Sequence, residues 1–168
     1  ILIGEIRDQE TMEYALNFAE TGHLCMATLH ANSANQAIDR IVNFFPVEQH
    51  DQVRNDLSLN IRAIVSQRLV RNTSGGRTAA IELLLSTATS RDAIAKGEIG
   101  QLKEIMKKSI EVGMMTFDQC LFDLYEAGEI SVQELQVNAD AKSDLMLRLK
   151  LNSPRFKREE MPGGIDAD

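Results

Sequence analysis

The chain has 168 residues, of which 18 are Lys or Arg and 25 are Asp or Glu, and its formal net charge is −7. With 43% apolar residues it can bury a core, which argues against wholesale disorder. The acidic balance argues against nucleic acid as a partner, because phosphate contacts need clustered basic side chains.

The first predicted element is a buried strand over residues 1–3, an aliphatic run that ends at Gly4. Because the chain begins inside this run, we expect it to be the C-terminal part of a longer polypeptide. Asp8 then predicts the N-terminal cap of a helix, and Gly22 predicts the end of that helix. No stretch approaches the roughly 20 apolar residues that a membrane-spanning helix needs.

Strand and helix patterns continue to alternate through the first half of the chain. They predict a strand over 23–29, a helix with its apolar face over 37–45, a longer helix over 53–65, and a β-hairpin whose turn at 72–76 precedes a return strand at 79–85. This alternation favours a parallel α/β sheet. The fold class predicted for the first half is therefore α/β.

Beyond Ser86 the pattern becomes helical. Capping and stop residues predict helix boundaries at Thr116, Gly128, Ser131 and Ser143. The sequence from Asn152 is polar and rich in Pro and Gly, which predicts a loose tail. The second half is thus expected to be a helical appendage to the α/β part.

Two polar residues follow the predicted strands, where ligands bind in open α/β sheets. Glu5 could polarise an attacking water or hold Mg²⁺ through water; the structural alternative is a strand-end carboxylate satisfied by the next helix. His30 could reach a phosphate near the start of the next helix, or could be a neutral loop histidine. Asn32 and Ser33 are most simply helix-capping residues.

A zinc site is not expected. His23 and His30 bracket one predicted strand and point to opposite faces, roughly 23 Å apart at about 3.3 Å per residue, so they cannot share a metal from that strand. Cys25 and Cys120 lie far apart, and the sequence has no CxxC pair. Both cysteines are interpreted as small, buried, unreactive hydrophobes.

The sequence also contains no GxxxxGK[ST] loop, no GxGxxG and no nucleophile elbow. It does resemble the secretion-type hexameric ATPases in a Walker B segment, ILIGEIRD at 1–8, and in a His box, TGH at 21–23 and TLHANSA at 28–34. Within that superfamily it resembles the type IV pilus retraction ATPases, the PilT/PilU family, as far as about Leu151. Two motifs in the same order make this resemblance specific.

The segments that distinguish the branches of the superfamily favour retraction ATPases. Extension and type II secretion ATPases usually follow their QRLVR segment with a four-cysteine zinc motif, whereas here QRLVR at 67–71 is followed by NTSGGR at 72–77, without a cysteine. The stretch at 89–96 departs from the AIRNLIRE-like helix of PilT members. The segments TFDQ at 116–119 and FDLYEAG at 122–128 look closer to the PilU branch.

The resemblance implies three segments: the C-terminal portion of a RecA-like P-loop NTPase domain at 1–88, a small helical C-terminal subdomain at 89–151, and a disordered tail at 152–168. It implies ATP and Mg²⁺ as ligands, and a homo-hexameric ring or one shared with a paralogous retraction ATPase. That ring would work in the cytoplasm at the bacterial inner membrane, beside the pilus platform protein, where ATP hydrolysis would drive pilus disassembly and twitching motility.

Residue roles are carried over from the same resemblance, position by position. Glu5 would be the Walker B carboxylate that activates water, with no direct metal contact beyond a water-mediated one to Mg²⁺, and His30 would sense the γ-phosphate. Motif positions expected to contribute to nucleotide binding are Gly4, Arg7, Asp8 and His23.

Family members bind ATP mainly through the Walker A loop, which this sequence lacks, so the chain by itself is predicted to hydrolyse ATP negligibly. Two alternatives stay open. One is a non-catalytic module that binds a protein partner through the helices at 90–149. The other is an extension or type II secretion ATPase, which the missing cysteines disfavour.

Overall fold

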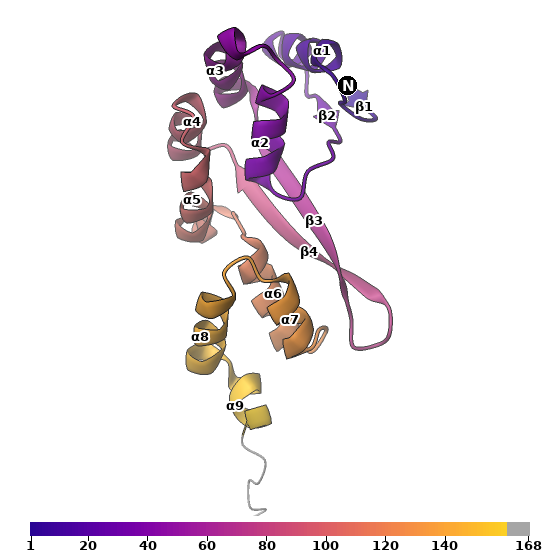
Figure 1. Ribbon diagram of the computed structural model, residues 1–168, viewed down its shortest axis with the longest axis vertical. Coiled ribbons are helices and arrows are strands. Elements are labelled where there is room, and N and C mark those ends of the chain that lie inside the picture. Colours follow the sequence, from indigo (N-terminus) through magenta and orange to yellow (C-terminus); the bar gives the residue numbers. More distant parts are fainter. Residues whose placement is uncertain (161–168) are drawn as a thin grey trace, which may run out of the picture. The chain divides into compact units, whose positions relative to one another are not determined.

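The computed structural model describes residues 1–160 (Figure 1). The elements in chain order are β1 (Leu2–Ile3), α1 (Gln9–Glu20), β2 (Met26–Ala27), α2 (Ala34–Val42), η1 (Val47–Gln49), α3 (His50–Asn60), β3 (Ala63–Arg71), β4 (Arg77–Leu85), α4 (Ala88–Ala95), η2 (Ile99–Gln101), α5 (Leu102–Lys108), η3 (Ile110–Val112), α6 (Phe117–Glu126), α7 (Val132–Asn138), α8 (Lys142–Asn152) and α9 (Pro154–Glu160). Among these described helices, none is long and apolar enough to cross a bilayer.

The chain divides into two compact units. The first comprises Ile1–Gln67 and Glu82–Thr116, and the second comprises Arg68–Ile81 and the described residues from Phe117 to Glu160. This division differs from the predicted boundary at residue 88, because α4 and α5 pack with the first unit rather than with the later helices. The two strands of the hairpin are also divided, and their turn belongs to the second unit.

In the first unit, β1 and β2 lie side by side and run parallel, with α1 between them in the chain (Figure 1). Leu2 is opposite Met26, and Ile3 is opposite Ala27. Parallel strands need a crossover between them, and α1 supplies it. A parallel pair connected by a helix confirms that the fold is of the mixed α/β kind.

The ends of α1 are where the sequence predicts them. The Asp8 side chain accepts a hydrogen bond from the Thr11 N–H at 2.8 Å, which caps the helix. Gly22 follows the helix with φ +92°, a left-handed conformation that glycine adopts without a steric penalty. Both boundaries therefore follow from local chemistry.

The predicted strand at 23–29 is much shorter in the structure, and the strands are not buried. Leu2, Leu24 and Met26 are 79%, 69% and 60% exposed. The physical reason is that this sheet has two strands in the described chain, so each of them is an edge strand. The apolar run that predicted burial is therefore only partly covered.

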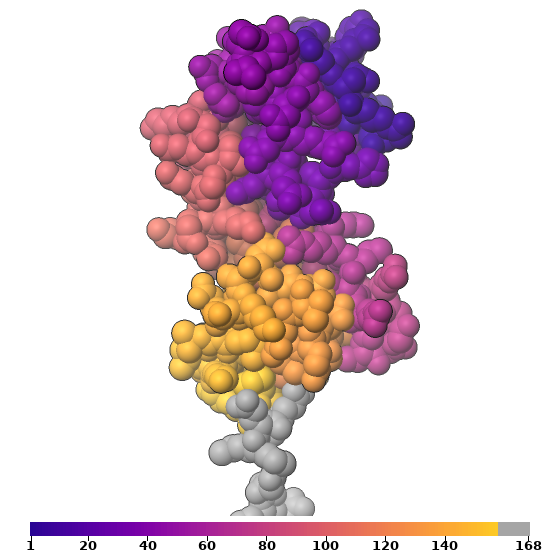
Figure 2. All heavy atoms as spheres, viewed as in Figure 1, coloured from indigo at the N-terminus to yellow at the C-terminus, as the bar shows by residue number. Residues whose placement is uncertain are grey.

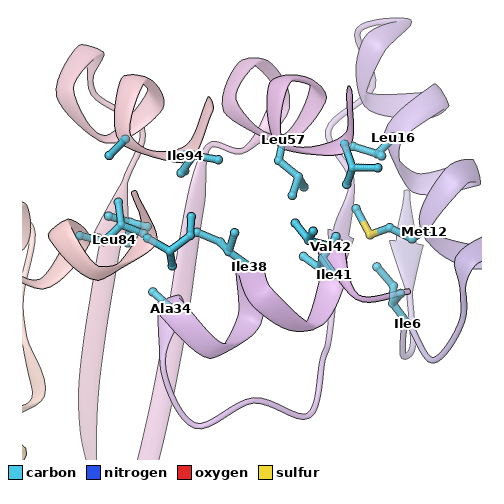
Figure 3. Packing of buried hydrophobic residues seen from close by; sticks show 14 of the residues in the cluster. Ile6, Met12, Leu16, Ala34, Ile38, Ile41, Val42, Leu57, Leu84 and Ile94 are labelled. Atoms are coloured by element: carbon cyan, nitrogen blue, oxygen red, sulfur yellow. The ribbon is translucent and has the colours of Figure 1, made fainter. Parts of the chain in front are cut away.

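The core of the first unit is built around α2. Figure 3 shows Ile38, Ile41 and Val42 projecting from this helix among side chains of the neighbouring elements. Buried residues that join them from other elements include Met12, Leu16, Leu57, Leu84, Ile94 and Met106. Burying each such side chain stabilises the fold by about 1.5–3 kcal/mol, so α2 is held mainly by its apolar face.

The predicted long helix at 53–65 is wrong in its second half. The helix α3 ends at Asn60, and β3 begins at Ala63. Val65 and Leu69 are exposed while Ser66 and Val70 are buried, which is the two-residue alternation of a strand. The β-branched residues in this stretch favour a strand, and that preference outweighs the helical spacing.

The predicted hairpin is confirmed. β3 and β4 form a two-stranded sheet, and the turn between them is closed by the Gly76 N–H, which donates to the Asn72 side chain at 2.6 Å. Gly75 adopts φ +89° within this turn. The turn thus uses the Asn and Gly chemistry from which it was predicted.

The second unit packs the helices α6, α7, α8 and α9 with the turn half of the hairpin. Figure 2 shows residues of α7 and α8, in orange to yellow, as a continuous surface on the face in view. The core of the second unit consists of Val70, Ala80, Phe117, Leu121, Tyr125, Ile130, Leu135, Leu145, Leu149 and Phe156. Strand residues and helix residues therefore share one core here.

Of the helix caps predicted in the second unit, Ser131 is confirmed and Ser143 is wrong. The Ser131 hydroxyl accepts from the Glu134 N–H at 3.2 Å and caps α7. The Glu134 carboxylate accepts from the Arg71 N–H at 2.9 Å, a contact with the hairpin that local sequence does not reveal. The helix α8 begins at Lys142, so Ser143 lies inside it and is not its cap.

The predicted tail begins too early. The helix α9 follows directly after Ser153, whose hydroxyl accepts from the Phe156 N–H at 2.9 Å. Phe156 is buried, and the Arg155 guanidinium stacks 4.3 Å from the centre of the Tyr125 ring. These contacts order a segment whose composition alone predicts a loop. The rest of the predicted tail, 161–168, lies outside the described residues.

Candidate functional site

Glu5 lies just beyond the carboxyl end of β1, in a segment that is fixed to the chain after β2. The Ile6 N–H donates to the Thr28 carbonyl at 2.9 Å, and the Thr28 hydroxyl donates to the Gly4 carbonyl. These two bonds flank Glu5 on either side. Its side chain, 20% exposed, is therefore held at the edge of the two-stranded sheet.

His30 lies beyond the end of β2 and meets Glu5 there. The Nε2 atom of His30 is 2.9 Å from Oε1 of Glu5. An ionised carboxylate can only accept hydrogen bonds, so this contact requires the hydrogen on Nε2. Two residues that the sequence marks as separate candidates thus form one site at the carboxyl ends of adjacent parallel strands.

Arg7 completes the group around Glu5. Its guanidinium donates to Oε2, the carboxylate oxygen that His30 leaves unused. This hydrogen bond lowers the pKa of Glu5; partial burial opposes the shift, and the charges of Arg7, His30 and Arg40 reinforce it. Glu5 is consequently ionised throughout the neutral range, as a general base must be.

An open hollow of about 400 Å³ adjoins His30 on the side of α2. It is lined by His30, Ala31, Gln36, Asp39, Arg40, Asn43 and Phe44. Arg40 contributes a cation and Asp39 a carboxylate, and the side-chain amides of Gln36 and Asn43 contribute donors and acceptors. The hollow can therefore receive a polar group beside the Glu5–His30 pair.

The other predicted site residues make local contacts. Asp8 is engaged in capping α1, and the hydrogen bond from Thr11 lowers the pKa of its carboxyl group. His23 follows α1, where Nδ1 lies 3.2 Å from the Thr21 hydroxyl and the ring packs edge-on against Phe18. Asp8 and His23 thus have structural partners, whereas Arg7 and His30 contact Glu5.

Sequence reasoning missed Arg40 and Thr28. Arg40 appears in the sequence as one of several scattered arginines, yet helical spacing places it on the same face as Gln36 and Asn43. That periodicity is a signal that could have found it. Thr28 is the first residue of the His-box segment at 28–34, but no local pattern indicates its bond to Gly4, which joins segments far apart in the chain.

The cysteines take no part in this site. Both are free and each is half-buried, less than the full burial predicted for them. Burial nonetheless raises the pKa of the Cys120 thiol, which keeps it protonated and unreactive at neutral pH. In the part of the chain that the structure describes, no group of three or more His, Cys, Asp or Glu side chains is arranged to hold a metal ion.

The sequence profile of the family "Type II/IV secretion system protein" matches residues 1–148. The chain belongs to this family. Among its relatives, the type IV pilus ATPase PilU of Pseudomonas aeruginosa is 56% identical over 154 residues, 91% of this chain and 40% of PilU. The pilus retraction ATPase PilT of the same species is 40% identical over 139 residues, 83% of this chain and 40% of PilT.

A solved structure of a similar protein has the same fold as this chain. The crystal structure of the pilus retraction motor PilT with bound ADP matches with a TM-score of 0.78 and 39% identity, over 88% of this chain and 41% of that one. The chain thus spans about two fifths of the length of the relatives it matches. The predicted membership of the PilT/PilU group is confirmed.

The ionic contacts of Glu5 lead to a titration experiment. Replacing Arg7 by alanine removes the hydrogen bond that does most to lower the pKa of Glu5, so this pKa should rise toward its ordinary value. Because the pKa is lowered in the folded protein, the stabilisation from the Glu5 contacts is present above the ordinary pKa and is lost as pH falls through the lowered one. Carboxyl ¹³C NMR measures the titration midpoint of Glu5 in the parent protein and in Arg7→Ala.

A matched control is Arg54→Ala, which removes an arginine from another acid, Asp51, in the same unit. It should leave the Glu5 midpoint unchanged. An unchanged midpoint in Arg7→Ala would show that Arg7 does not hold this carboxylate in solution.

Proposed function

We propose that this chain is the C-terminal part of an ATP-hydrolysing motor that retracts type IV pili. The observation that carries the proposal is the Glu5–His30 contact at the ends of two parallel strands, in a chain similar to PilU and PilT. The segment at 72–77, which directly follows QRLVR at 67–71, contains no cysteine, and this favours retraction over the zinc-bearing extension ATPases.

In this proposal Glu5 is the general base for the water that attacks the γ-phosphate. Its lowered pKa keeps it in the accepting form, yet both of its oxygens are engaged, Oε1 by His30 and Oε2 by Arg7. A base must come within about 2.6–3.2 Å of the water it activates, and each carboxylate oxygen keeps a second lone pair that can accept from that water. His30, which carries the hydrogen on Nε2, would donate it to the γ-phosphate instead and free a further acceptor site on Oε1.

The ligands of the reaction are proposed to be ATP and Mg²⁺. A carboxylate suits Mg²⁺ because this cation prefers oxygen ligands and keeps several waters, so Glu5 would reach it through water. Bound Mg²⁺ supplies charge neutralisation of the phosphates. Gly4 and Arg7 would border the nucleotide, while Asp8 and His23 would support the loops through their local contacts.

The proposed assembly is a ring in the cytoplasm at the inner membrane of a bacterium. The ring would be a homo-hexamer or would include a paralogous retraction ATPase, and its partner would be the pilus platform protein of the inner membrane. The RecA-like core at 1–88 and the helical subdomain at 89–151 are proposed as the functional division of this chain, distinct from its two packing units. Its acidic charge suits a protein cargo rather than nucleic acid.

The experiment that tests this function compares two proteins. One is the chain alone; the other is the full-length protein, meaning this chain with the upstream segment that carries the phosphate-binding loop in its relatives. The full-length protein is expected to hydrolyse ATP well above background, and the chain alone at background, because the chain alone lacks the loop amides and lysine that cradle phosphates.

Phosphate release at saturating ATP measures both rates, with heat-denatured protein as the background. Turnover by the chain alone that Glu5→Gln abolishes would contradict the predicted inactivity. A full-length protein without ATP turnover would favour the alternative of a protein-interaction module.

A further inference from the structure

A buried carboxylate links the hairpin to the loop that carries His30. Glu82 lies in β4 and is fully buried, and its Oε1 accepts a hydrogen bond from the Ala34 N–H at 2.7 Å. The backbone beside it is fixed, because Leu83 exchanges hydrogen bonds with Met115 at 2.8 and 3.0 Å. Glu82 is therefore a stationary anchor within the first unit.

Ala34 is the first residue of α2, and a backbone N–H at that position has no acceptor within its own helix. The Ser33 hydroxyl already caps the helix by accepting from the Gln36 N–H at 3.2 Å. Burying a carboxylate is costly, and a helix that has a side-chain cap and an apolar face can form without a buried carboxylate at its start. We therefore look for a role of the Glu82 contact other than beginning α2.

The position of His30 indicates this role, because only three residues lie between His30 and Ala34. On the other side of His30, Thr28 is bound to the backbone on both sides of Glu5. The loop is thus tied to the Glu5 segment at one end and to Glu82 at the other. Figure 3 shows Ala34 and Ile38 on the side of α2 that faces Leu84 of the same strand.

We propose that Glu82 is a positioning residue, which holds the loop so that the His30 ring meets Glu5. This inference rests on the proposed function, since it assumes that His30 acts in ATP hydrolysis. Glu82 does not contact the reacting atoms and acts only through the backbone of Ala34. A misplacement of about 1 Å in a catalytic group can cost 100-fold in rate, so the anchor has a measurable consequence.

The experiment uses the full-length protein and separates kcat from KM. Glu82→Leu should lower kcat roughly 10-fold to 100-fold while KM for ATP changes less than about 2-fold, because the phosphate-binding loop is untouched. Glu82→Gln keeps an acceptor of the same shape and should stay within about 3-fold of the parent. Leu84→Ala removes a buried side chain of the same strand and should lower stability without lowering kcat.

The decisive measurement repeats Glu82→Leu in a His30→Ala background. If Glu82 acts through His30, it should cause no further loss there, because the effects of coupled residues do not add. An equal loss in both backgrounds would overturn the positioning role and leave the proposed function standing. Unchanged hydrolysis in His30→Ala alone would instead overturn the role of His30 in the proposed function.

A second variant covers the case in which Glu82→Leu does not fold. Glu82→Met keeps the length of the side chain but removes both carboxylate oxygens, so the Ala34 N–H loses its acceptor with little change in buried volume. It should reproduce the loss of kcat. A folded Glu82→Met protein with the parental kcat would overturn the proposal.

Discussion

Replacing Glu5 by glutamine in the full-length protein is expected to lower kcat for ATP hydrolysis by at least about 100-fold, the usual contribution of a general base. The amide has nearly the shape of the carboxylate but cannot take a proton from water. Nucleotide binding should persist, because this residue acts on the water and not on the adenosine or the phosphate-binding loop. Phosphate release measures the rate, and calorimetric titration with ADP measures the binding.

A matched control is Glu13→Gln on α1, an exposed carboxylate that accepts from the Gln9 side chain at 2.8 Å. It changes the net charge by the same amount and should leave kcat unchanged. If Glu5→Gln kept the parental rate, Glu5 would be a strand-end carboxylate with a structural role only, satisfied by Arg7 and His30 and not by the next helix as the sequence suggested.

Phe117→Ala is expected to loosen the second unit, lowering its free energy of unfolding by about 3–5 kcal/mol. The ring is fully buried, and the Arg68 guanidinium stacks 3.8 Å from its centre while binding Asp140 at 2.7 Å. Removing the ring leaves a cavity and takes away the surface on which Arg68 is held. Hydrogen exchange of the full-length protein, read by mass spectrometry, should show faster exchange in α6, α7 and α8.

The same measurement tests the division into two units, because peptides from α2 should keep their protection. The control is Val137→Ala, a side chain that is 80% exposed and should change little. Unchanged exchange in α6 to α8 after Phe117→Ala would mean that this ring does not stabilise the unit. Faster exchange throughout the protein would mean that the units unfold together.

Local chemistry made much of the fold predictable. The cap at Asp8, the stop at Gly22 and the turn at 72–76 each depend on residues that are close in the chain. The predictions that were wrong concern segments whose residues favour a helix by one criterion and a strand by another. At Val65 the spacing of apolar residues suits a helix, whereas the β-branched side chains and the pairing of β3 with β4 favour the strand that forms.

The site was predictable in its members but not in its geometry. Glu5 and His30 stand out because each follows a strand, and a motif resemblance identifies both. Their contact, and the hydrogen bond from the Ala34 N–H to Glu82, join segments up to 48 residues apart. No local pattern encodes such distances.

The sequence by itself determined the family, the parallel α/β start of the chain and the two residues at the centre of the candidate site, because motifs and strand ends are local features. Only the tertiary structure decided which of the neighbouring polar residues touch Glu5, where the compact units divide and that Pro154–Glu160 is helical. The physical reason is that burial and hydrogen bonding between distant segments select one arrangement among several that local preference allows.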